Sequence, residues 1–151
     1  MSKKVYLTAN GLNKLHEEKI QLTALRKNTI HDLQRAREMG DLSENGFYKA
    51  TKSRLSEIDH RLFTINHLLK ISVQIENPNS DKVQIGSKVK LVNEEEKKSY
   101  TIVGDIEADP LNNQISRHSP LGKILMGKKT GEQVTLQLPR RQVSYTIAEI
   151  E

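Results

Sequence analysis

The first half of the chain contains two stretches in which apolar residues recur at helical spacing. From Leu12 to Met39 they fall at heptad intervals, and the second stretch occupies successive a and d positions. The first set is Leu12, Leu15, Leu22, Leu33 and Ala36, and the second is Tyr48, Thr51, Leu55, Ile58, Leu62, Ile65 and Leu69. We expect two helices, the first of them capped by Thr8.

A short segment, 40–43, separates the two stretches and predicts a tight turn. Gly40 can end the first helix because glycine readily adopts the left-handed conformation. Segments 12–40 and 44–72 are each 29 residues long and lie symmetrically about Leu42. Two equal helices joined by a turn predict an antiparallel coiled-coil hairpin, which at about 1.5 Å per residue would extend roughly 40–45 Å.

The pattern changes after Ile75. The polar segment 76–81 predicts a linker between a hairpin at 1–75 and a second domain at 82–151. That second domain contains runs rich in β-branched residues, which predict strands. They cover residues 83–92, 100–106, 134–138 and 143–150.

One short helix is expected within this second domain. Ser119 is suited to the N-cap and Pro120 to the first turn, and the helix should run through Leu125 and end at Gly127. The predicted fold class is therefore α+β: an N-terminal antiparallel α-helical coiled-coil hairpin and a C-terminal antiparallel sheet domain with one short helix.

Composition agrees with a thin apolar seam and a small core. Of the 151 residues, 35% are hydrophobic, 4% aromatic and 28% charged, too few apolar side chains for one large round core. The absence of cysteine excludes disulfides and thiolate metal sites. No apolar stretch approaches the roughly 20 residues that span a bilayer, and the start of the chain lacks a signal-peptide core. We expect a cytoplasmic protein with no membrane partner.

The net charge of +5 is unevenly distributed. Residues 1–75 contain 13 Lys and Arg against 8 Asp and Glu, whereas residues 76–151 contain 11 of each. The basic excess of the first half favours an anionic partner there. A solvated helix surface is the commoner explanation of such a modest imbalance.

Candidate chemistry is concentrated at the predicted turn. Asp41 and Glu44 have the spacing of a capping box, which would start the second helix. Two carboxylates at the end of an arm are also suited to Mg²⁺, which prefers oxygen ligands. A basic collar that could hold a nucleic-acid backbone surrounds them, formed by Arg35, Arg37, Lys49, Lys52 and Arg54. Spacing alone leaves both roles of the acids open.

The segment Ala36–Tyr48, A-R-E-M-G-D-L-S-E-N-G-F-Y, closely resembles the tip of the bacterial Gre transcript-cleavage factors, where the pattern is A-R-E-x-G-D-L-S-E-N-x-x-Y. The resemblance continues through Leu7–Leu15, Tyr100–Gly104 and Ser119–Lys128. Within the GreA/GreB family, the segment 52–59 resembles the GreB branch and the segment 105–109 the GreA branch, which is slightly favoured. Two departures lie at the tip: Met39 stands where histidine is common, and Gly46-Phe47 where Ala-Glu is common.

The resemblance implies a transcription elongation factor that binds RNA polymerase at its secondary channel. The C-terminal domain, FKBP-like in the family, would dock there, and we assign the contact to Ser119, Pro120 and Leu121; ordinary core packing of Leu121 is the alternative. The hairpin would carry Asp41 and Glu44 to the active site, where they would share a Mg²⁺ ion with polymerase and position water. Polymerase would then cleave backtracked nascent RNA, so the chain would be an accessory factor, with no tightly bound cofactor.

The resemblance also implies contact with the nascent RNA 3′ end. We assign this contact to Arg37, Lys49, Lys52 and Arg54, name DNA as a further candidate partner, and expect a monomer. Three alternatives stay open: a paralogue that enters the channel and inhibits polymerase, a plain RNA- or DNA-binding module, and a structural coiled-coil adaptor.

Overall fold

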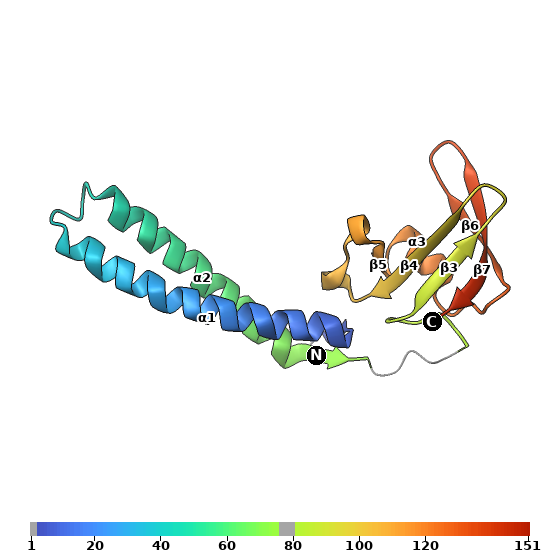
Figure 1. The fold of residues 1–151 in the computed structure, drawn as a ribbon, viewed down its shortest axis with the longest axis horizontal. Coiled ribbons are helices and arrows are strands. Elements are labelled where there is room, and N and C mark those ends of the chain that lie inside the picture. Colours follow the sequence, from blue (N-terminus) through green and yellow to red (C-terminus); the bar gives the residue numbers. More distant parts are fainter. Residues whose placement is uncertain (1–2, 76–80) are drawn as a thin grey trace. The chain divides into compact units, whose positions relative to one another are not determined.

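The computed structural model describes residues 3–75 and 81–151, and their contacts divide the chain into two compact units (Figure 1). One unit is Asn13–Ile71, and the other joins Met1–Leu12 to Ser72–Glu151. The predicted linker, 76–81, lies outside the described residues except for its last position. None of the helices described is long and apolar enough to cross a membrane.

The first unit is the expected helical hairpin. Helix α1 spans Ala9–Glu38 and α2 spans Gly46–Ile71, and the two run antiparallel (Figure 1). Thr8 caps α1, because its Oγ1 accepts the N–H of Gly11 at 3.1 Å. After α1 the chain turns at Gly40, whose φ of +111° is costly for other residues.

The seam between the helices is formed by the heptad positions. Leu15, Ala36, Thr51, Ile58 and Ile65 are buried, and the other predicted seam residues are partly buried. A further residue, Thr29, is also buried there and satisfies its hydroxyl by donating to the Leu25 carbonyl at 2.8 Å. The heptad interpretation is confirmed.

Two ion pairs join the flanks of α1 and α2. Arg61 donates to both carboxylate oxygens of Glu18, at 2.6 and 2.8 Å, and the Arg26 Nε lies 2.5 Å from Asp59 Oδ1. All four side chains are more than a third exposed, so each pair should contribute only about 0.2–1 kcal/mol.

The second unit contains a five-stranded sheet in the order β5-β4-β3-β7-β6. Its strands are β3 (Lys88–Val92), β4 (Lys97–Val103), β5 (Gln114–Ser116), β6 (Gln133–Gln137) and β7 (Gln142–Ile150). The sheet is mixed, not wholly antiparallel as we expected, because β5 joins β4 in parallel. The short helices η1 (Asp105–Glu107) and η2 (Pro110–Asn112) lie in the connection between these two strands.

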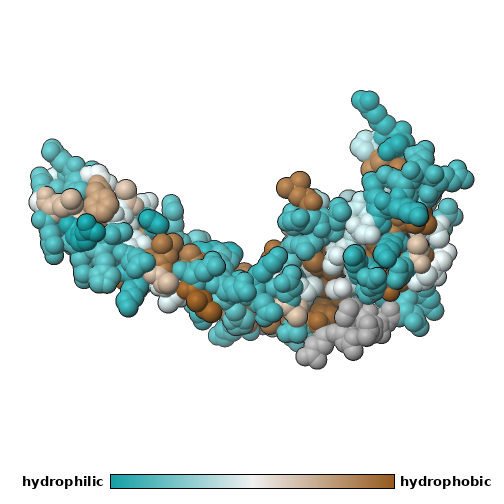
Figure 2. All heavy atoms as spheres, in the orientation of Figure 1, coloured by the Kyte–Doolittle hydropathy of each residue, from teal (hydrophilic) through white to brown (hydrophobic). Residues whose placement is uncertain are grey.

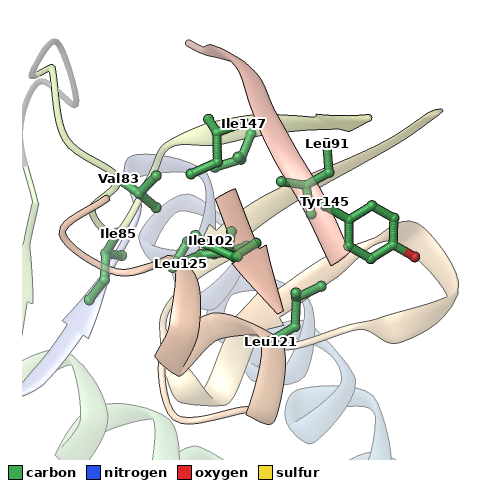
Figure 3. Packing of buried hydrophobic residues seen from close by; sticks show 10 residues of the cluster. Val83, Ile85, Leu91, Ile102, Leu121, Leu125, Tyr145 and Ile147 are labelled. Atoms are coloured by element: carbon green, nitrogen blue, oxygen red, sulfur yellow. The ribbon is translucent and has the colours of Figure 1, made fainter. Parts of the chain in front are cut away.

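Helix α3, Pro120–Leu125, covers part of this sheet as the sequence indicates. The Ser119 hydroxyl accepts the N–H of Gly122 at 3.0 Å, and Gly127 follows the helix with φ +79°. Figure 3 shows Leu121 and Leu125 of α3 directed toward sheet residues such as Ile102. The complete buried cluster is Val83, Ile85, Val89, Leu91, Ile102, Leu121, Leu125, Val134, Tyr145 and Ile147.

A small parallel pair of strands belongs to the second unit and not to the hairpin. β1 (Val5–Leu7) pairs with β2 (Ser72–Gln74), so the ends of the segment we assigned to the hairpin, 1–75, are grouped with the sheet. Glu107 strengthens this grouping: its carboxylate accepts the N–H and the hydroxyl of Thr8 and the N–H of Gly104. A Cβ at Gly11 would lie 2.1 Å from a Glu107 oxygen, so a larger residue would displace this carboxylate.

Candidate functional site

The segment that joins the two helices forms the tip of the hairpin and presents both predicted acids. Residues 41–45 lie between the helices without regular structure, and Asp41 and Glu44 are exposed. Asp41 Oδ1 accepts the N–H of Ser43 at 3.0 Å and the Ser43 hydroxyl at 2.8 Å. Glu44 makes no hydrogen bond or ion pair with any residue that the structure describes.

Asn45, not Asp41, caps α2, which corrects the capping-box interpretation. The Asn45 Oδ1 accepts the N–H of Tyr48 at 3.0 Å, and its carbonyl accepts the N–H of Lys49 at 3.1 Å. Its Nδ2 also donates to the Ala36 carbonyl at 2.9 Å, which ties the end of α1 to the start of α2. The sequence favoured Asp41 because the pattern D-x-x-E fits a helix start equally well four residues before the observed cap.

The electrostatics of Asp41 follow from its turn. The Ser43 hydroxyl, followed by the Ser43 backbone N–H, holds the pKa of the Asp41 carboxyl below its ordinary value. Hydrogen bonds to the ionised form favour that form, so Asp41 is a carboxylate at neutral pH. Because one of its oxygens satisfies the turn, the other is free to ligate.

The two acids do not form a complete metal site by themselves. Mg²⁺ demands near-octahedral coordination by oxygen and retains several waters, and two carboxylates fit part of such a shell. Residues 3–75 and 81–151 contain no group of three or more acidic, histidine or cysteine side chains able to hold a metal ion. Among the residues that the structure describes, the tip therefore offers two carboxylates but no complete metal site.

The predicted basic collar lies on both helices next to the tip. Arg37 is in the last turn of α1, with its guanidinium 6.0 Å from the centroid of the Tyr48 ring. Lys49, Lys52 and Arg54 lie on α2, and all four cations are exposed. Arg54 stands about 140° around the helix from Lys49, so the structure groups Lys49 with Lys52 and separates Arg54 from them.

The three predicted docking residues differ in accessibility. Pro120 is exposed, Ser119 is half-buried at the cap of α3, and Leu121 is buried in the core. Leu121 was expected to contact polymerase, but at 9% exposure it packs against the sheet and offers no side chain to a partner. Its role is the core packing that we named as the alternative.

Comparison with known proteins identifies the family. Residues 5–73 match the N-terminal domain profile of transcription elongation factor GreA/GreB, and residues 77–151 match the C-terminal profile of the same family. The transcription elongation factor GreA of Caldanaerobacter subterraneus subsp. tengcongensis is 43% identical, and that of Nitratiruptor sp. 38%. These alignments cover 99% of this chain and 99% and 94% of the respective relatives.

A solved structure of the transcription factor Gfh1 is similar to this chain as well, with a TM-score of 0.50 and 25% identity over 99% of each chain. The expected resemblance is confirmed in both halves, and the curated relatives carry the GreA name. This chain therefore belongs to the GreA/GreB family of transcription elongation factors, which act on RNA polymerase.

Proposed function

We propose that the chain stimulates cleavage of backtracked nascent RNA by RNA polymerase, contributing Asp41 and Glu44 to a metal site that polymerase completes. The observation that carries this proposal is that the fold has no use for the two charges. Asn45 caps α2, Glu44 has no partner among the described residues, and Asp41 needs only one acceptor oxygen for its turn. Exposed carboxylates that are not needed for the stability of the fold are available to bind a metal ion.

The division of labour follows from the number of ligands. A pair of carboxylates on an exposed turn holds Mg²⁺ weakly, but it can complete a shell that another protein has half built. When bound, such an ion supplies Lewis-acid activation of water and stabilises charge on the phosphodiester. Asp41 and Glu44 would hold the ion and orient water, while the polymerase active site would bind the RNA. The chain is thus an accessory factor and not itself the nuclease.

The hairpin is suited to deliver these acids into a narrow channel. Helices of 30 and 26 residues are about 39–45 Å long at about 1.5 Å per residue. The ion pairs Glu18–Arg61 and Arg26–Asp59 flank the apolar seam in the part of the arm remote from the tip. Only a thin two-helix cross-section has to enter the channel.

The collar would hold the extruded RNA beside the acids. Arg37, Lys49, Lys52 and Arg54 form no ion pair among the described residues, so their charges are available to phosphate. Contacts to the phosphate backbone position a nucleic acid without reading its sequence. Nascent RNA is the partner that the proposed function brings to this arrangement.

The second unit would dock on polymerase and keep the arm in the channel. Pro120 and the basic residues Lys123 and Lys129 are exposed, Ser119 is half-buried beside Pro120, and Leu121 supports them from the core. We expect the protein to act as a cytoplasmic monomer, since one hairpin fills one channel.

The direct experiment is an RNA cleavage assay on a stalled, backtracked elongation complex. Adding the protein should shorten the RNA from its 3′ end and allow synthesis to resume, and the protein without polymerase should leave the same RNA intact. Polymerase binding without cleavage would instead identify an inhibitory paralogue. Salt-sensitive binding to free RNA or DNA with no effect on polymerase would identify a nucleic-acid-binding module.

A further inference from the structure

A shallow groove opens at the tip, and its lining includes neither Asp41 nor Glu44. It is lined by Arg35, Glu38 and Met39 from the end of α1 and by Phe47 from the first turn of α2, and its volume is about 300 Å³. Figure 2 shows moderately apolar atoms at this end of the hairpin among hydrophilic ones. The groove is at the lower limit of the roughly 300–1,000 Å³ typical of small-molecule sites.

The apolar side chains of this groove are not buried by the packing of the two helices. Phe47 is 47% exposed and Met39 is 72% exposed, although the seam close by is closed by Ala36 and Thr51. Two large apolar side chains, one from each helix, are therefore exposed together along the groove and are open to a ligand.

The charges around the groove indicate what kind of molecule it takes. Arg35 lines the groove, is 77% exposed, and has only a long contact of 4.0 Å with Asp32. Segment 35–54 contains five Lys and Arg against three Asp and Glu. An aromatic ring beside the weakly paired guanidinium of Arg35 fits a ligand that combines a flat π-face with negative charge, which is the chemistry of an unpaired nucleotide. An apolar protein segment would not require the cations.

We propose that this groove binds one unpaired nucleobase of single-stranded RNA, stacked on Phe47 and beside the guanidinium of Arg35. The inference rests on the proposed function, which brings extruded RNA to the tip. It adds a contact to the base, whereas the collar contacts only phosphate. Glu38 lies on the rim and provides an acceptor for exocyclic amino groups of the base.

The test pairs a protein change with an RNA change. Backtracked elongation complexes are prepared with an extruded RNA segment that either carries its bases or is abasic. For each RNA, the concentration of full-length protein giving half-maximal cleavage is measured for the wild type and for Phe47→Ala. Stacking of one base on one aromatic ring corresponds to a factor of about 5 to 100 in affinity.

We expect Phe47→Ala to raise this concentration about 5- to 100-fold on RNA with bases and to leave it unchanged on abasic RNA. Phe47→Trp should restore the wild-type value on RNA with bases, whereas Phe47→Leu, apolar but without a π-face, should behave like Phe47→Ala. Phe63→Ala is the matched control, because Phe63 lies on the same helix, is 73% exposed and is remote from the tip. It should change nothing, and far-ultraviolet circular dichroism should show each variant folded.

Each other outcome has a defined meaning. An equal loss by Phe47→Ala on both RNAs would overturn the inference, since the groove would then contact protein in the channel. If the wild type stimulates cleavage and Phe47→Ala has the same half-maximal concentration, the base contact is overturned but the proposed function is not. No cleavage by the wild type would overturn the proposed function and, with it, this contact.

Discussion

At the scale of single residues, the tip separates the residue that starts a helix from the residues that carry charge. Asn45 makes three hydrogen bonds: it accepts the N–H groups of Tyr48 and Lys49, which starts α2, and it donates to the Ala36 carbonyl, which joins α2 to α1. Asp41 serves only the turn that precedes the helix, and Glu44 serves neither. Within the five residues 41–45, the side chain that starts the helix is therefore different from the two side chains that carry negative charge.

This assignment predicts opposite outcomes for two substitutions. Asn45→Ala should lower the free energy of unfolding by about 0.5–2 kcal/mol, because a helix cap is lost. Asp41→Asn should lower it very little, since the amide oxygen can still accept from Ser43. Urea unfolding followed by circular dichroism measures both, with Asn45→Asp as the cap-preserving control. A loss for Asn45→Ala no larger than that for Asp41→Asn would show that Asn45 is not the cap.

The depressed pKa of Asp41 gives a second residue-scale prediction. Ser43→Ala removes the main cause, the hydroxyl donor, so the pKa of Asp41 should rise but stay below its ordinary value because the Ser43 N–H remains. A depressed folded-state pKa means that the turn is stabilised above the ordinary pKa of about 3.9 and loses this contribution as pH falls through the folded-state value. Carbon NMR of the Asp41 carboxyl, with Ser53→Ala as control, measures the shift. A pKa that stays the same would exclude the hydroxyl as its cause.

At the scale of elements, the hairpin depends on a narrow seam. Ile65 is fully buried and Ile20 is 71% exposed, so the two isoleucines test the seam within one structure. Ile65→Ala should cost about 2–5 kcal/mol, and Ile20→Ala less than about 0.5 kcal/mol. Chemical denaturation followed by the helical circular dichroism signal gives both values, and similar costs at the two positions would contradict the observed packing.

Much of this element structure can be predicted from the sequence, because heptad spacing determines which face of each helix is buried. Ile58 and Ile65 are buried as their positions require, and the cap at Ser119 follows from Ser-Pro. The strands β1, β2 and β5 were missed. Each is only three residues long, too short for an alternating pattern, and exists because a distant segment pairs with it.

Contacts between distant segments also limit how much of the candidate site can be predicted from the sequence. A sequence pattern identifies which residues can ligate, but Glu107 shows how tertiary contacts assign other roles: it holds Thr8, almost a hundred positions earlier. Leu121 shows the converse, since a residue of a candidate docking segment is used by the core. The groove at Phe47 depends on α1 and α2 meeting at the tip, which spacing alone does not reveal.

The basic collar leads to a prediction about how cleavage depends on the length of the extruded RNA. Lys49/Lys52/Arg54→Ala should reduce cleavage more on long backtracks than on short ones, because longer extruded RNA offers more phosphates. The loss should weaken as salt rises, since phosphate contacts release counterions. Lys14/Lys27/Lys70→Ala removes the same charge from exposed hairpin positions and is the control. Equal losses on long and short backtracks would argue against RNA contact.

At the scale of the whole molecule, the chain combines two compact units, to which the proposed function assigns separate tasks. One is a helical arm with a charged tip, and the other is a mixed sheet with its own core. A change at the tip should therefore leave docking intact, because no residue of the sheet core lies in 41–45. This independence makes the acid pair a clean test of the proposed function.

The most direct measurement is cleavage of backtracked RNA by polymerase with the Asp41→Asn/Glu44→Gln variant. Both substitutions preserve shape and remove the negative charge, and Asn45 still caps α2. We predict a loss of cleavage stimulation of at least about 100-fold, since even indirect partners of a metal contribute roughly 10- to 100-fold. The variant should still displace wild-type protein from polymerase. Full stimulation by this variant would contradict the account, because the acids would then have no part in the reaction.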